Sequence, residues 1–190
     1  MGRTKPLLPW GPTTMLGQTL TNLLGSQVDE ALVVTGHDAA EVGKVAAAHG
    51  VRAVHNAAYA TGEMISSVQA AIGALPENCA GVLVVLADQP LIPTAIFDQV
   101  IAAFRAGKGE IVAPVYRQQR GHPVLFGRRF FPALLALPPG AAPRDLVRDH
   151  ADELYLLPVE SDTILLDLDR PEQYERFRPD IAGEEEDACS

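Results

Sequence analysis

The feature that most restricts the fold of this chain is an unbroken apolar run at residues 82–87, which ends abruptly at Asp88, Gln89 and Pro90. A run of this kind, without alternating polar positions, is typical of a strand covered by helices on both faces of a parallel sheet. Ligands of open α/β sheets bind beyond the carboxyl ends of the strands, so Asp88 lies where a functional acid is expected. Alternatively, Asp88 only caps the turn before a helix that begins near Thr94. The segment alone does not decide between these two interpretations.

Segments with strand character alternate with segments of helical character along the chain. The predicted strands are residues 31–35, 51–55, 82–87, 111–115, 123–126, 154–157 and 164–166, and the predicted helices are residues 14–24, 38–49, 64–75, 94–106, 130–136, 144–150 and a last one from Pro171. This alternation predicts an α/β fold, a three-layer sandwich with a mostly parallel, Rossmann-like sheet and right-handed crossovers. The polar turn at residues 117–121 predicts that the strands on either side of it form a hairpin near one edge of the sheet.

Composition narrows the class of protein. A chain of 190 residues with 47% hydrophobic residues is expected to form one globular domain, residues 1–180, followed by an acidic, disordered tail at residues 181–190. The net charge of −9 argues against a nucleic-acid binder. Cys79 and Cys189 form no disulfide framework or metal-ligand spacing, and no apolar run is long enough to span a membrane. We therefore expect a cytoplasmic protein with no nucleic-acid or membrane partner.

Five groups of residues with side chains suited to catalysis or ligand binding fall at strand ends or in the loops that follow them. They are Arg3 with Lys5, Gly62 with Ser66 and Ser67, Asp88 alone, Gly121-His122-Pro123, and Asp167 with Asp169. Acids from separate strand ends are a plausible magnesium site, because Mg²⁺ binds carboxylate and phosphate oxygens while it keeps some waters. A glycine lets the backbone approach a ligand, and serines at a helix start offer donors to an anion.

Each group also has a purely structural interpretation. Ser66 and Ser67 are equally well explained as residues in the first turn of a helix. His122 is more simply a structural histidine, and Asp169 is a natural N-cap for a helix with Pro171 in its first turn. The spacing of residues supports no catalytic triad, no Cys/His metal cluster and no Walker-type phosphate loop.

Taken together and in order, residues 1–10, 62–68, 86–90, 121–125 and 166–172 resemble the corresponding motifs of the MobA-like nucleotidyltransferases. The resemblance implies a Mg²⁺-dependent transfer of a nucleotidyl group from an NTP to a phosphate-bearing acceptor, with release of pyrophosphate. By the same resemblance, Lys5 steadies the triphosphate and Asp88 holds Mg²⁺, with Asp167 or Asp169 as a second ligand. It also assigns nucleotide binding to Arg3, Gly62, Ser66 and Ser67, and the acceptor side to Gly121, His122 and Pro123.

The resemblance is greatest to members that use CTP and a molybdopterin-type molybdenum cofactor, with a molybdenum hydroxylase as a further partner. Two alternatives stay open: a related transferase for another NTP or a sugar-phosphate acceptor, and a non-catalytic chaperone that binds a nucleotide or cofactor. Family members carry a strand and a Leu-Ala-Ala-Gly-x-Ser-x-Arg loop ahead of the segment that matches Met1 and Gly2. We therefore expect a sheet without the first strand of the family. Residues 139–145 follow the Gly-Asp-x-Gly-x-Arg pattern of the family only loosely.

Overall fold

The computed structural model describes residues 4–61 and 63–179. The strands are β1 (Pro9–Trp10), β2 (Thr13–Thr14), β3 (Leu32–Thr35), β4 (Arg52–His55), β5 (Gly81–Val84), β6 (Ile111–Tyr116), β7 (Gln119–Arg120), β8 (Val124–Gly127) and β9 (Leu154–Pro158). The α-helices are α1 (Met15–Leu24), α2 (Ala39–Ala48), α3 (Glu63–Gly73), α4 (Thr94–Arg105), α5 (Phe131–Ala136), α6 (Pro143–Asp149) and α7 (Pro171–Phe177). Short 3₁₀ helices are η1 (Lys5–Leu7), η2 (Arg128–Phe130), η3 (Ala151–Glu153) and η4 (Asp162–Leu165). None of the described helices combines the length and apolar character needed to cross a bilayer.

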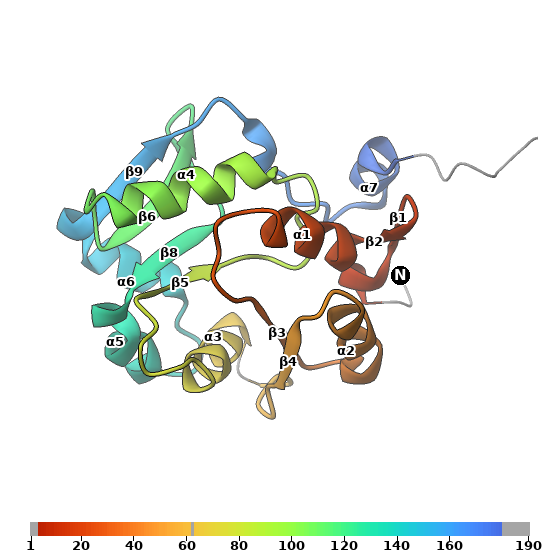
Figure 1. The fold of residues 1–190 in the computed structure, drawn as a ribbon, viewed down its shortest axis with the longest axis horizontal. Helices are drawn as coiled ribbons and strands as arrows, with labels where there is room; N and C mark the ends of the chain where they lie inside the picture. Colours follow the sequence, from red (N-terminus) through yellow and green to blue (C-terminus); the bar gives the residue numbers. More distant parts are fainter. Residues whose placement is uncertain (1–3, 62, 180–190) are drawn as a thin grey trace, which may run out of the picture.

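The main sheet has the order β5-β8-β6-β7, with β9 also paired to β6 (Figure 1). Strand β8 is antiparallel to both of its neighbours and β9 is parallel to β6, so β5, β6 and β9 run in one direction. The predicted α/β fold with a mostly parallel sheet is thereby confirmed. The predicted hairpin of β6 and β8 also forms, but its position near an edge was wrong. Strand β8 lies between β5 and β6, and all four of its residues are buried, as an interior position requires.

Helices cover both faces of this sheet because neighbouring residues of a strand point to opposite sides. On one face, α3, α5 and α6 pack around Ile111, Ala113 and Phe126. On the other face, α4 packs against Val112 and Leu125. The arrangement is the expected three-layer sandwich (Figure 1).

Strands β3 and β4 form a separate parallel pair, which Figure 1 shows beyond β5 on the side away from β8. Two helices connect this pair to the main sheet. Helix α1 packs Leu20 against Val33 of β3 and Leu23 against Leu83 of β5, while α3 contacts β3 and also packs against Val82. Within the described residues, β3 and β5 each lack a strand partner on the edge toward the other.

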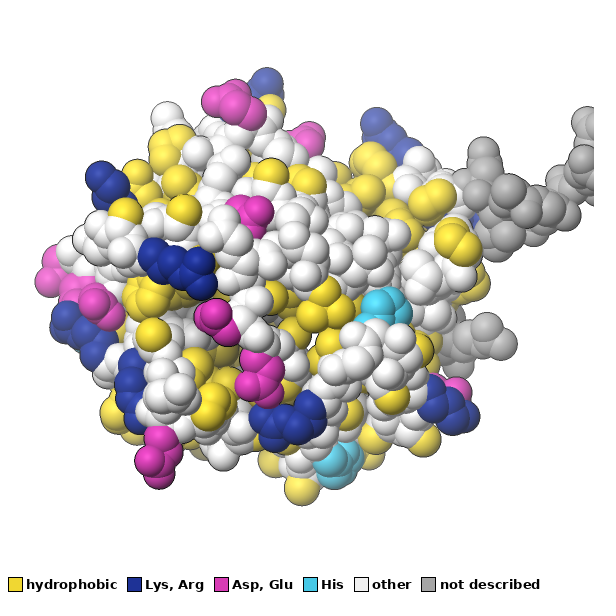
Figure 2. All heavy atoms as spheres, viewed as in Figure 1, with side chains coloured by type: hydrophobic (Ala, Val, Ile, Leu, Met, Phe, Trp, Pro, Cys, Tyr) yellow, Lys and Arg dark blue, Asp and Glu magenta, His cyan; other side chains and the backbone are white. Residues whose placement is uncertain are grey.

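The open edge also corrects one expectation about β5. Residues 82–87 were predicted to be buried on both faces, yet every residue from Gly81 to Asp88 is only partly buried. Helices cover both faces of β5, but no strand in the described part of the chain covers its second edge, so solvent reaches β5 from that side. Figure 2 shows hydrophobic side chains at the surface between α1 and α3, the two helices that flank this edge.

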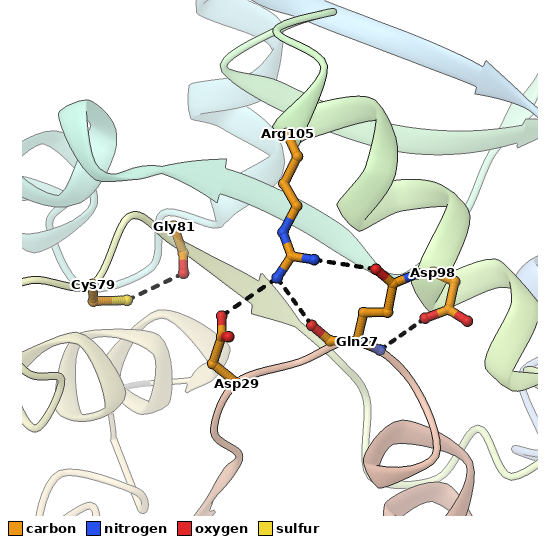
Figure 3. Close-up of polar contacts among 6 residues, drawn as sticks. All are labelled: Gln27, Asp29, Cys79, Gly81, Asp98 and Arg105. Atoms are coloured by element: carbon orange, nitrogen blue, oxygen red, sulfur yellow. Dashed lines mark hydrogen bonds and ion pairs between the residues drawn. The ribbon is translucent and has the colours of Figure 1, made fainter.

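The connection from α1 to β3 is fixed to α4 near the start of β5 (Figure 3). The Arg105 guanidinium donates to the side-chain and backbone oxygens of Gln27, both at 3.2 Å, and forms an ion pair with Asp29 at 3.6 Å. The Gln27 backbone N–H donates to Asp98 of α4 at 2.8 Å. These contacts hold the chain in place where it passes from the main sheet to the β3–β4 pair.

Candidate active site

Four charged side chains from distant parts of the chain come together beyond the end of β5. Lys5 lies in η1, Asp88 follows the apolar strand, and Asp167 and Asp169 follow η4. Lys5 Nζ lies 2.5 Å from Asp169 Oδ1, so an ion pair joins the two ends of the described chain. Lys5 also interacts electrostatically with Asp88 and Asp167. The structure therefore brings together the lysine and all three acids that the sequence singled out for the triphosphate and the metal.

Packing between the first and last segments explains why Lys5 meets Asp169. The hairpin of β1 and β2 places Trp10 and Met15 in a small core with Leu168 and Tyr174. The Tyr174 hydroxyl donates to the Pro9 carbonyl at 2.5 Å. Because Leu168 is buried in this core, its neighbours Asp167 and Asp169 remain exposed on either side of it.

The electrostatics of the cluster are dominated by its excess of acids. Burial raises the pKa of Asp88; its own backbone N–H and the Lys5 charge oppose that shift, while Asp169 and Asp167 add to it. The hydrogen bond to Asp169 raises the pKa of Lys5; partial burial opposes this shift, and attraction by the three carboxylates adds to it. Three carboxylates around one lysine leave a local negative excess that a bound cation would relieve.

The structural interpretation of Asp169 is wrong. Asp88 does lie in a turn ahead of α4, whose N-cap is Pro93. The N-cap of α7 is Arg170, which leaves Asp169 outside the helix and paired with Lys5. The predicted strand at residues 164–166 is also absent, since this segment forms the end of η4 and the turn after it.

Gln89 is a residue of this site that the sequence analysis missed. It is only 3% exposed, and its Nε2 donates to Asp167 Oδ1 at 3.3 Å. Its Oε1 is buried without a hydrogen-bond partner among the described residues. Its position next to Asp88 was visible in the sequence, but only the acid was interpreted.

The donors of this cluster fit a hard divalent cation. Carboxylate oxygens are the ligands that Mg²⁺ and Mn²⁺ prefer. In residues 4–61 and 63–179, however, no group of three or more His, Cys, Asp or Glu side chains forms a ready-made metal site. The arrangement therefore suits an ion that takes one or two protein oxygens and completes its shell with phosphate and water.

The Gly121-His122-Pro123 segment lies directly beside η4. The His122 backbone N–H donates to the Ile164 carbonyl at 3.2 Å, and the His122–Pro123 peptide bond is cis. Burial lowers the pKa of the His122 imidazole; Asp167 opposes this shift and Arg120 adds to it. His122 is therefore within electrostatic range of both Asp167 and Arg120, with its neutral form favoured.

The structure places the two serines at another strand end. Asn56 follows β4, and its Nδ2 donates to Ser66 Oγ at 2.7 Å and to Ser67 Oγ at 3.1 Å. No hydrogen bond or ion pair within the described parts of the chain links either serine to Lys5 or Asp88. Asn56 is a second residue that the sequence analysis missed, although its place at a strand exit was visible. Arg3, Gly62 and the acidic tail lie outside the described residues.

An α/β sheet that carries a lysine and several carboxylates beyond the carboxyl end of a strand has the features of an enzyme that handles phosphate groups. The chain belongs to the MobA-like NTP transferase family, because the domain description of that family matches residues 1–154, and it is accordingly a nucleotidyltransferase.

Individual relatives agree with this classification. The chain is 28% identical to a molybdenum cofactor cytidylyltransferase of Escherichia coli K12 over 92% of this chain and 86% of that protein. The structure is also similar to Rv0371c of Mycobacterium tuberculosis in a complex with manganese, with a TM-score of 0.77 and 28% identity over 92% of this chain and 91% of that one. A nucleotidyl transferase of Methanothermobacter, 24% identical with a TM-score of 0.77 over 92% of this chain and 83% of that one, shares the fold.

Proposed function

We propose that this protein is a Mg²⁺-dependent cytidylyltransferase that transfers CMP from CTP to a molybdopterin-type molybdenum cofactor. The observation that carries the proposal is the cluster of Lys5, Asp88, Asp167 and Asp169, whose residue types suit a triphosphate and its metal. The identity to the E. coli enzyme supports this choice of base and acceptor. The acceptor implies that the product is delivered to a molybdenum hydroxylase, which we propose as a partner.

In this reaction an acceptor phosphate oxygen attacks the α-phosphorus of CTP. A new P–O bond forms, the bond to the oxygen that bridges the α- and β-phosphates breaks, and pyrophosphate leaves with that electron pair. Such a transfer depends on positioning and on neutralising charge, and a phosphate oxygen is already a nucleophile. The bound divalent cation would supply charge neutralisation between the phosphates.

Each residue of the cluster has a role in this scheme. Lys5 is kept protonated by its carboxylate neighbours and steadies the triphosphate, which would displace Asp169 from it. Asp88 holds the metal. The second ligand would be Asp167, which Gln89 orients, or Asp169, which the triphosphate would release from Lys5.

The remaining assignments follow the resemblance described above. Arg3, Gly62, Ser66 and Ser67 are proposed to bind the nucleotide, with Asn56 fixing the two serines. Gly121, His122 and Pro123 line the acceptor side, which agrees with the position of His122 near Asp167. A reducing cytoplasm suits this function, and Cys79 is a free thiol.

The decisive experiment compares the wild type with Asp88→Asn and with a control variant, Asp152→Asn. Asp152 is an exposed acid in η3 and lies outside the cluster. Pyrophosphate release is measured with CTP, the molybdopterin-type cofactor and titrated Mg²⁺. We expect Asp88→Asn to lose turnover and Asp152→Asn to retain it, because an amide is a poor ligand for Mg²⁺.

The same assay separates the alternatives. Near-normal release by Asp88→Asn at saturating Mg²⁺ would remove Asp88 from the mechanism. Faster release with GTP or with a sugar-phosphate acceptor would favour a related transferase. Binding of CTP without any release of pyrophosphate would favour the non-catalytic chaperone.

A further inference from the structure

A second cluster of charged residues lies outside the site described above. Arg120 of β7 and Arg144 and Arg148 of α6 line a pocket of about 380 Å³, together with the apolar side chains of Val147 and Leu154. The arginines come from two elements that are separated in sequence by the whole of β8 and α5. The pocket is wide open to solvent, so it suits one charged group of a ligand rather than enclosure of a whole molecule.

The pocket carries more positive charge than its surroundings neutralise. Arg148 is paired with Asp145 at 3.0 Å and with Asp149 at 3.2 Å. In contrast, Arg120 and Arg144 make no ion pair with any carboxylate in the described parts of the chain. The Ala142 backbone N–H lowers the pKa of Asp145, and the charges of Arg148 and Arg144 add to this effect, so Asp145 offsets part of the Arg144 charge.

This local charge is opposite in sign to that of the chain, which has a net charge of −9. A single unpaired arginine on a surface is ordinary, since water solvates it well. In this pocket two guanidinium groups lack an ion-pair partner among the described residues, and a bound oxyanion would supply a counter-charge to both. Arginine is also the side chain best suited to phosphate, because its planar donors match the phosphate oxygens in pairs.

The pocket adjoins the acceptor side of the candidate active site. Arg120 directly precedes Gly121 and His122, and its pairing with Val115 of β6 fixes its place on the sheet. His122 is within electrostatic range of both Arg120 and Asp167. The backbone of His122 is bonded to Ile164 in η4, just ahead of Asp167. One short segment therefore connects the arginine pocket to the proposed metal site.

We propose that Arg120 and Arg144 bind a phosphate-type oxyanion group of the acceptor substrate and so set its position on the His122 side of the site. This inference rests on the proposed function, because it takes that reaction as the reason for an acceptor to be present. Neither arginine touches the reacting atoms, so both act as positioning residues that determine which acceptors are used.

The test has a binding arm that needs no turnover. Inorganic phosphate is titrated calorimetrically into the wild type, the double variant Arg120→Gln/Arg144→Gln and the control Lys108→Gln, which removes one positive charge from the exposed turn after α4. All three are also melted, and equal melting temperatures are expected because both arginines are exposed. We expect phosphate affinity to fall about tenfold in the double variant and to stay unchanged in the control. Unchanged affinity in the double variant would overturn the inference.

The second arm measures steady-state pyrophosphate release. The double variant should raise the acceptor KM about tenfold while the CTP KM and kcat stay within about twofold of wild type. A rise in the CTP KM instead would assign the pocket to the nucleotide and overturn the inference. If the wild type itself releases no pyrophosphate with any acceptor, the proposed function fails. Loss of phosphate binding in the double variant would then still show an oxyanion site, so the two failures are distinguishable.

Discussion

Gly121 is the position where a single methyl group should do the most damage to the candidate site. A Cβ atom there would lie 2.2 Å from the Ile164 carbonyl oxygen, 2.7 Å from its carbon and 2.8 Å from the Ile164 Cβ. Ile164 cannot retreat, because it is 1% exposed and packs in a core with Ile92 and Phe97. The Gly121→Ala variant must therefore displace the backbone of one segment or the other.

The expected cost follows from what is displaced. Overpacking of a closely packed core typically costs about 1–3 kcal/mol. The His122 N–H to Ile164 carbonyl hydrogen bond would lengthen or break, which adds about 1 kcal/mol. A total of about 2–4 kcal/mol corresponds to a fall in melting temperature on the order of 5–15 °C for a chain of this size.

The matched control is Gly43→Ala in α2. A Cβ at Gly43 meets no atom within 4 Å, so the substitution should raise the free energy of unfolding by about 0.5–1 kcal/mol through helix propensity. Both variants are melted alongside the wild type by circular dichroism. Pyrophosphate release is then measured well below each melting temperature, where all variants are folded.

Gly121→Ala should also lose activity while it is folded. Asp167 follows Ile164 closely, and its hydrogen bond from Gln89 is already long at 3.3 Å, so a shift of η4 would break it. If Gly121→Ala melts and turns over like the wild type, the close approach of Gly121 to Ile164 is not what fixes this part of the site.

Two further predictions concern the charged cluster. Lys5→Ala should weaken CTP binding about tenfold in calorimetric titrations. It should change the free energy of unfolding by at most about 1 kcal/mol, because the ion pair of Lys5 with Asp169 is largely exposed. Unchanged CTP affinity would show that Lys5 is only a surface residue. Because burial raises the pKa of Asp88 above its ordinary 3.8, ionising this acid opposes folding. Its contribution to stability is therefore most favourable below its unfolded pKa and declines as the pH rises through the raised folded value. Asp88→Asn should melt at least as high as the wild type at pH 7, with the difference shrinking toward pH 3, and a variant that melts lower at pH 7 would contradict this sign.

Much of the fold could be predicted because helices and strands have local signals. The apolar spacing in α1 and α4 and the proline at the start of α7 placed these helices to within a residue or two. The position of β8 could not be predicted, since strand order depends on pairing between residues far apart in sequence. The segment at residues 164–166 was apolar enough for a strand, but it turns as η4 to pack Ile164 against α4.

The residues of the candidate site were likewise only partly predictable from the sequence. Asp88 was predictable from its place after an apolar strand, and the acids near residue 168 from the family motif. The ion pair of Lys5 with Asp169 required the packing of Trp10 on Tyr174, which no local pattern reveals. Gln89 and Asn56 were missed because an amide at a strand exit is common in turns, and only the buried contacts of these two side chains distinguish them.

The unpaired edges of β3 and β5 lead to a last prediction. Both strands lie between α1 and α3, yet no strand among the described residues joins them, so their backbone donors and acceptors on these edges lack ladder partners. Thr4 and Lys5 lie near Asp38 and Asp88, which follow β3 and β5 respectively. A parallel strand placed between them would therefore end close to the start of η1.

Fusing one apolar strand and a loop, about 10–15 residues in all, ahead of Met1 should fill this space. At about 1 kcal/mol per ladder hydrogen bond, a gain of several kcal/mol would raise the melting temperature on the order of 5–10 °C. CTP affinity should rise as well, because the added loop would end beside Lys5. The control is an extension of equal length made of Gly and Ser, which is flexible and forms no strand. If the apolar extension melts no higher and binds CTP no more tightly than this control, the two edges do not accept a strand.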